Sequence, residues 1–150
     1  PSILVLTRQG LKQARLENND DNLSAKGGYV ISKASSDAAV TIIATGSEVE
    51  IAIEAQAELE AMGTATKVVS MPSWEKFDAQ SPTYQEDVLG NPQVFASIEA
   101  GSTFGWEKYV GRDGVKIGID EFGASAPASD LYNHFGVTKE NLVSQIKANL

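Results

Sequence analysis

The sequence has no cysteine and a single histidine, and these two shortages exclude several kinds of chemistry. Without cysteine there are no disulfides, thiolate nucleophiles or thiolate metal ligands. His134 is the one candidate base for a Ser-His-Asp triad, and because no nucleophile elbow accompanies it we interpret it as a surface residue near a helix end. Metal ligands would have to be carboxylates, and no Asp-rich calcium loop occurs. We therefore expect no catalytic residue and no metal site in this chain.

Positive charge and long apolar runs are also scarce. The 12 Lys and Arg residues are outnumbered by 20 Asp and Glu residues, which gives a net charge of −8 without any basic run that would neutralise nucleic-acid phosphates. Apolar stretches such as residues 40–44 are far shorter than the roughly 20 residues that a membrane-spanning helix needs. The amino end shows no secretory signal pattern. We expect a cytoplasmic protein that binds neither nucleic acid nor a membrane.

What the sequence does contain is a regular alternation of strand and helix patterns in a chain of 150 residues, the usual size of one domain. Short runs rich in β-branched residues, separated by helical patterns, predict strands at residues 29–32, 40–45, 65–70, 94–99 and 116–120. Such an alternation is typical of a parallel sheet covered on both faces. The predicted fold is therefore α/β, a three-layer α/β/α sandwich with a mostly parallel (mixed) five-stranded sheet.

The helix after residues 40–45 carries the strongest boundary signals. Ser47 is a candidate N-cap with Glu50 as its capping-box partner, and Gly63 suits the left-handed position after the helix. Apolar spacing directs Val49, Ala52, Ile53, Gln56 and Leu59 toward the sheet and leaves Glu48, Glu50, Glu54 and Glu58 on the solvated side. Further helix boundaries are expected at Ser81, Pro82, Gly90, Pro127, Gly136 and Thr138. The terminal stripe of Leu142, Val143, Ile146 and Leu150 should dock against the sheet.

The amino-terminal part looks different from the remainder. Residues 1–6 resemble the last strand of a preceding unit, and residues 17–22 with Gly27 and Gly28 have the composition of a linker. We therefore assign residues 1–27 to the end of a preceding domain plus linker, and residues 28–150 to the domain proper. The chain is expected to be a piece of a larger enzyme.

Three loops and a group of aromatic residues are candidates for binding. The turn at residues 45–48 could hold a small anion, although Glu48 and Glu50 in the first helical turn would repel phosphate. Loops 101–105 and 122–127 follow strands at the edge where α/β sheets usually bind ligands, and their glycines fit a site loop or a plain turn equally well. The aromatic residues suit either the core or a surface buried against another domain or subunit: Trp74, Phe77, Tyr84, Phe104, Trp106 and Tyr109.

Several short segments together resemble the carboxy-terminal region of transketolase, where the preceding domain is the pyrimidine-binding one. They are TRQ at 7–9, GGYV at 27–30, IATGSEVE at 43–50, VVSMPSW at 68–74, EAG at 99–101 and FGASAP at 122–127. These matches are collinear over almost the whole chain, and the family commonly has asparagine where Gly10 stands. Deoxyxylulose-phosphate synthase and the β subunits of 2-oxo-acid dehydrogenases share this last domain, but 68–74 and 122–127 look more like transketolase.

The resemblance implies a homodimeric ketol-group transferase of the pentose phosphate pathway, acting on sugar phosphates with thiamine diphosphate and a divalent metal, Mg or Ca. The family's cofactor motif and catalytic histidines are absent from these 150 residues, so the chain alone is expected to be inactive and to act as structural scaffold for the upstream domains. One position carries over, because Arg8 matches the family's arginine that contacts the substrate phosphate. The alternative is a regulatory module that binds a small anion or nucleotide.

Overall fold

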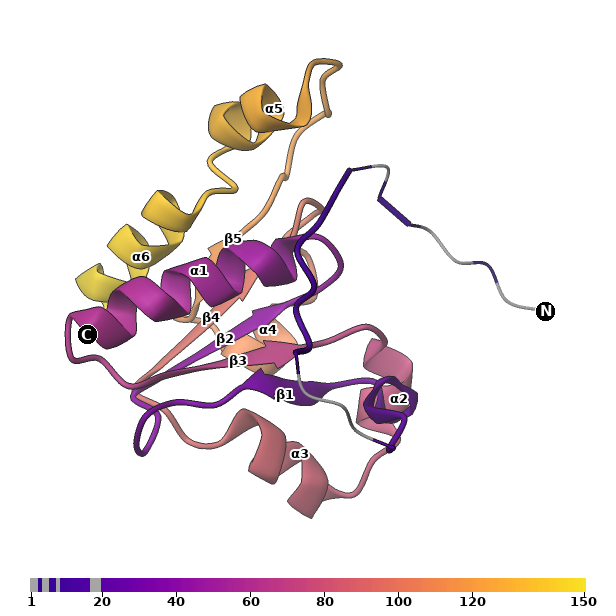
Figure 1. Ribbon diagram of the computed structural model, residues 1–150, viewed down its shortest axis with the longest axis vertical. Helices are drawn as coiled ribbons and strands as arrows, with labels where there is room; N and C mark the ends of the chain where they lie inside the picture. The colour runs from indigo at the N-terminus through magenta and orange to yellow at the C-terminus, as the bar shows by residue number, and fades with distance from the viewer. Residues whose placement is uncertain (1–2, 4–5, 8, 17–19) are drawn as a thin grey trace.

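The computed structural model describes residues 3, 6–7, 9–16 and 20–150 (Figure 1). Its centre is a five-stranded sheet in the order β1-β3-β2-β4-β5, in which β1 is antiparallel to β3 and the other neighbours are parallel. The strands are β1 (Tyr29–Ser32), β2 (Val40–Ala44), β3 (Thr66–Ser70), β4 (Val94–Ile98) and β5 (Val115–Ile117). Helices cover both faces of this mixed sheet, so the predicted three-layer α/β sandwich is confirmed.

Helices α1 (Glu48–Ala61) and α6 (Lys139–Ala148) lie together on one face of the sheet (Figure 1). The other face is covered by α2 (Trp74–Asp78), α3 (Pro82–Leu89) and α4 (Glu107–Val110). Because side chains alternate along a strand, Ile42 of β2 belongs to the core on the α1 side and Ile43 to the core on the α3 side. Every residue of β2 is buried, as expected for a central strand covered on both faces.

The observed strands match the predicted ones within one residue at either end, except at β5. The predicted run 116–120 ends at Ile117 because the next residues leave the ladder: Ile119 N donates to the carbonyl of Gly101 at 2.7 Å. A Cβ at Gly118 would lie 2.7 Å from that same carbonyl oxygen, so a glycine allows the close approach. The chain after β5 therefore joins the loop that follows β4.

Helix α1 begins and ends where predicted, but the predicted capping interaction at its start is absent. Gly63 has φ +84°, and Thr64 N donates to Leu59 O at 2.9 Å, which is the expected left-handed helix ending. Ser47 stands at the N-cap position as predicted, but the predicted capping box is wrong, because the Ser47 backbone is already helical and its hydroxyl donates to Glu48 Oε1 at 2.7 Å. Of the residues predicted to face the sheet, all are buried except Ile53, which is half-buried.

The remaining predicted boundaries agree closely with the structure. Ser81 caps α3 by accepting from Tyr84 N, and Thr138 caps α6 by accepting from Asn141 N. Pro127 stands one position before α5 (Ala128–Phe135) rather than inside its first turn, and Gly136 follows it with a left-handed backbone. Within the terminal stripe, Leu150 is 44% exposed, whereas Leu142, Val143 and Ile146 are buried in the α1-side core.

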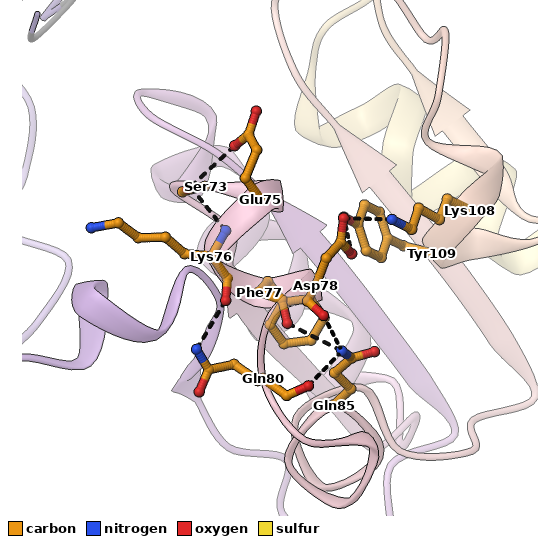
Figure 2. Close-up of polar contacts among 9 residues, drawn as sticks. All are labelled: Ser73, Glu75, Lys76, Phe77, Asp78, Gln80, Gln85, Lys108 and Tyr109. Atoms are coloured by element: carbon orange, nitrogen blue, oxygen red, sulfur yellow. Dashed lines mark hydrogen bonds and ion pairs between the residues drawn. The ribbon is translucent and has the colours of Figure 1, made fainter. Parts of the chain in front are cut away.

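Three short helices had no predicted counterpart: α2, α4 and the 3-10 turn η1 (Leu23–Lys26). Side-chain hydrogen bonds tie α2 and α4 to their neighbours (Figure 2). Gln85 of α3 donates to the carbonyls of Phe77, Asp78 and Gln80 at the end of α2. Asp78 in turn accepts from Lys108 and from the Tyr109 hydroxyl of α4. One hydrogen-bond network therefore joins α2, α3 and α4 on that face of the sheet.

Candidate functional site at the carboxyl edge of the sheet

The loops that follow β2, β4 and β5 meet at the carboxyl edge of the sheet, where α/β folds usually bind ligands. The first side chain there is Glu48, which is 4% exposed and therefore lies on the buried side of α1, contrary to the predicted solvated position. Its carboxylate accepts from Ser47 Oγ at 2.7 Å, from Tyr132 OH at 2.7 Å and from Ala100 N at 3.0 Å. Glu48 thus joins the start of α1 to helix α5 and to the loop after β4.

A second carboxylate, Glu99, directly follows β4 and accepts from the indole nitrogen of Trp106 at 2.9 Å. Trp106 is 1% exposed and packs edge-on against Trp74, with ring centroids 4.9 Å apart. Burial of an indole whose N–H is bonded is the arrangement expected of a core tryptophan. For Trp106 the core interpretation is therefore correct.

A third carboxylate, Asp120, joins the loop after β5 to the loop after β4. It accepts from Ser102 Oγ at 2.9 Å, from Thr103 N at 2.8 Å and from Thr103 Oγ1 at 2.6 Å. The hydrogen bonds from the Thr103 hydroxyl and backbone N–H, and then from Ser102, lower the pKa of Asp120 below its usual value. The carboxylates of Glu48, Glu99 and Asp120 therefore all accept hydrogen bonds from donors of the chain itself.

The turn at residues 45–48 also uses its own backbone donors. Glu48 N donates to Thr45 O at 3.3 Å and Glu50 N donates to Ser47 O at 3.4 Å. With the Glu48 carboxylate buried beside these groups, the start of α1 carries negative charge where an anion would have to bind. The arrangement agrees with the expectation that the acidic helix start disfavours phosphate.

Two phenylalanines at this edge have no place in either core. Phe104 is 90% exposed and Phe122 is 99% exposed. Phe104 follows Thr103 directly and Phe122 lies two residues after Asp120, so the Asp120 hydrogen bonds hold the two loops together right beside both rings. The residues 121–127 that surround Phe122 are all exposed. We call Phe104 together with residues 121–127 the carboxyl-edge surface.

Of the predicted aromatic group, Phe104 alone therefore fits the alternative of a surface that another domain would bury. Phe77, Trp106 and Tyr109 are buried, and Trp74 and Tyr84 are half-buried against them. Phe122 was missed as an interaction residue because the FGASAP segment was interpreted through its glycine and proline. An aromatic residue between strand and helix patterns with no apolar periodicity around it is the signal that could have found it.

The other predicted site residues contribute no chemistry to this edge. His134 lies exposed in the last turn of α5, with its ring edge-on to Phe135 at 4.8 Å. Across the described residues, no group of three or more His, Asp or Glu side chains is placed to hold a metal ion. Arg8 lies outside the described residues.

Comparison with known proteins identifies the family. A sequence profile described as "Transketolase-like TK C-terminal domain" matches residues 27–138, which is most of the chain. The chain belongs to this family. The transketolase of Sinorhizobium medicae is 48% identical over 97% of this chain, and the chloroplastic transketolase of Solanum tuberosum is 50% identical over 98% of it.

Solved transketolases have the same fold. A transketolase mutant from Pichia stipitis matches 95% of this chain with a TM-score of 0.81 at 35% identity. The matched part is 20% of the Pichia chain. Transketolase from Leishmania mexicana matches 83% of the chain with a TM-score of 0.76 at 40% identity, over 18% of its length. The chain likewise spans 21% of the Sinorhizobium relative and 20% of the potato relative, about a fifth of each.

Proposed function

We propose that this chain serves as the C-terminal scaffold domain of a transketolase, a transferase that moves a two-carbon ketol unit between sugar phosphates of the pentose phosphate pathway. Family membership over residues 27–138 supports the proposal, as does the match to about a fifth of the curated transketolases. The scaffold role is carried by one observation, the carboxyl-edge surface. Two phenylalanines that are 90% and 99% exposed lie on loops held together by hydrogen bonds, as expected of a surface that another domain covers.

The whole protein would use thiamine diphosphate and a divalent metal ion, and the residues described here do not fit either group. No set of three potential ligands gathers in the described part of the chain. The carboxylates of Glu48, Glu99 and Asp120 already accept hydrogen bonds from this chain's own donors. We propose that the rest of the protein holds cofactor and metal, and that residues 28–150 form the domain while residues 1–27 connect it to the preceding one.

The experiment is a pair of substitutions in the whole protein, Phe104→Ser and Phe122→Ser, made singly and together. Because both rings are exposed, we expect the isolated chain to fold with unchanged stability, whereas the whole protein should lose dimer stability and activity. Met62→Ser is the control, since Met62 is 51% exposed at the far end of α1, away from this edge. Sedimentation velocity and a ketol-transfer assay measure the outcome. Full activity and an intact dimer in the double variant would refute the proposed role of this surface.

Arg8 is proposed to contact the substrate phosphate in the whole enzyme, a role supported by the resemblance at residues 7–9. A guanidinium suits the task because its planar N–H groups meet phosphate oxygens in pairs. Arg8→Ala should raise KM for phosphorylated substrates by about 10- to 150-fold, corresponding to about 1.5–3 kcal/mol for hydrogen bonds to a charged group. Non-phosphorylated substrates should be unaffected, and an equal loss for both classes would exclude phosphate contact.

The compartment belongs to the same proposal. Across the described residues, no helix has both the length and the apolar character to cross a membrane. We propose the cytoplasm, and the chloroplastic potato relative makes a plastid the alternative. A fluorescent fusion of the whole protein in its own cell distinguishes the two locations.

The second candidate, a regulatory module for a small anion or nucleotide, rested on the turn at 45–48 and the loop at 101–105. The buried Glu48 carboxylate and the internally bonded loop weigh against it. Calorimetric titration of the chain with inorganic phosphate, a sugar phosphate and a nucleotide is the direct test. Saturable binding heat from any of the three would support the regulatory function.

A further inference from the structure

The opposite edge of the sheet, where its parallel strands begin, holds a lysine in an unusual position. Lys67 is the second residue of β3 and is paired in register with Thr41, the second residue of β2. Val69 and Ile43, two residues further along these strands, belong to the α3-side core. Because side chains alternate along a strand, Lys67 and Thr41 extend to that same face. Both therefore lie beneath the end of α3.

The end of α3 limits the space around the amine. Thr41 Oγ1 donates to the carbonyl of Leu89, the last residue of α3, at 3.0 Å. Gly90 follows with φ +69°, and a Cβ at Gly90 would lie only 2.8 Å from the Lys67 Nζ. The amine therefore stands directly against the backbone of Gly90, in a place that a side chain at position 90 would fill.

A cavity of about 370 Å³ opens beside this amine. Its walls include Asp37, Thr41, Gly90 and Asn91 together with Lys67 itself. Asp37 is the other titratable residue among the described cavity walls, and it is exposed. The acidic residues of α3 at the same end, Glu86 and Asp87, are also exposed. A small molecule can therefore reach the amine from solvent.

The Lys67 amine has no hydrogen-bond or ion-pair partner among the residues that the structure describes. This distinguishes it from Lys12, which pairs with Glu50 and Glu54, and from Lys139, which pairs with Glu58. Burial lowers the pKa of Lys67, whereas the hydrogen bonds that Lys12 and Lys139 donate to carboxylates raise the pKa values of those two lysines. A larger fraction of Lys67 is therefore neutral and nucleophilic at neutral pH than of the ion-paired lysines.

We propose that Lys67, an unpaired amine at the wall of an open cavity, is a site of covalent acylation by small acyl phosphates. The neutral amine attacks the carbonyl carbon, an N–C bond forms and the C–O bond to phosphate breaks, with the electron pair leaving on the phosphate. The proton of the attacking nitrogen passes to water or to the Asp37 carboxylate in the same cavity. The Asn91 side-chain amide offers a donor at the same wall for an oxygen of the incoming group. The product is a neutral amide on Lys67.

The test treats the folded chain with acetyl phosphate at pH 7.5 and measures the initial rate of acetylation at each lysine by peptide mass spectrometry. We expect Lys67 to react at least about threefold faster than Lys12, Lys139 and the exposed Lys147, since only the neutral amine attacks. The ratio of Lys67 to Lys147 should fall as the pH is raised toward 10, where exposed amines also lose their protons. In urea, where burial is lost, the rates should converge.

Asp37→Asn provides a variant on an exposed loop residue that leaves the amine in place. If Asp37 accepts the proton, this variant should slow acetylation of Lys67 while leaving Lys147 unchanged. Equal rates at Lys67 and Lys147 in the folded chain would overturn the proposal. A rate ratio that stays constant with pH would also overturn it, because accessibility alone would then explain the selectivity.

Discussion

Replacing Glu48 by alanine is the most informative change to the fold, because this residue was expected on the surface and is 4% exposed. Its carboxylate joins three segments through Ser47 Oγ, Tyr132 OH and Ala100 N. Glu48→Ala removes all three bonds at once. Ser47 and Tyr132 are half-buried and their hydroxyls can turn to water, whereas the backbone N–H of Ala100 cannot rotate toward a new partner.

The expected cost is about 3 kcal/mol. Hydrogen bonds to a charged group contribute about 1.5–3 kcal/mol each, and the partial exposure of the three donors reduces the sum of the three bonds to about 3 kcal/mol. For a domain of this size, a loss of about 3 kcal/mol corresponds to a fall in Tm of about 6–12 °C. Glu54→Ala is the matched control on the same helix, because Glu54 is exposed and its ion pair with Lys12 contributes at most about 1 kcal/mol.

Urea unfolding followed by tryptophan fluorescence measures both variants, since Trp106 is buried in the folded chain. Glu48→Gln separates charge from shape: it keeps one oxygen acceptor and should recover part of the loss. If Glu48→Ala were no more destabilising than Glu54→Ala, the carboxylate would not join these segments in solution, and the description of the carboxyl edge would be wrong.

Three further predictions concern other parts of the molecule. Because the folded pKa of Asp120 is lowered, its bonds to Thr103 stabilise the loops above the ordinary aspartate pKa of about 3.9, and the hydrogen-exchange protection of residues 101–105, relative to the intrinsic rate at each pH, should fall as the pH falls below that value. Asp120→Asn should show the faster exchange already at pH 7. Gly28→Ala should destabilise by about 1–3 kcal/mol in urea unfolding, since its Cβ would lie 2.7 Å from Met71 Sδ and from the Phe77 ring, while Gly123→Ala has nothing within 4 Å and should be neutral.

The strands and the main helix ends were predictable because they depend on local chemistry. Val40–Ala44 is an apolar run rich in β-branched residues, Gly63 takes the left-handed conformation that ends α1, and Thr138 caps α6. Each of these signals lies within a few residues of the feature that it specifies. The three-layer order follows from them, because parallel strands joined by helices must be covered on both faces.

The features that sequence reasoning missed depend on contacts between distant segments. Glu48 looks like the first member of an acidic helix face, and its burial follows from Tyr132, which is 84 residues away in the chain. The end of β5 is set by the Gly101 carbonyl, and α2 is completed by Gln85 of the following helix. None of these partners could be inferred from spacing, because the hydrogen bonds that decide them form only after the sheet has assembled.

The two edges of the sheet differ in what their polar groups are free to do. At the carboxyl edge the carboxylates of Glu48, Glu99 and Asp120 accept from donors of the same chain, and the large apolar side chains exposed there are Phe104 and Phe122. An edge of that kind favours contact with another folded surface over capture of a charged ligand. At the amino edge the amine of Lys67 lies beside an open cavity and has no hydrogen-bond or ion-pair partner among the described residues. We therefore propose docking at the edge where α/β sheets usually bind ligands and covalent reactivity at the opposite edge.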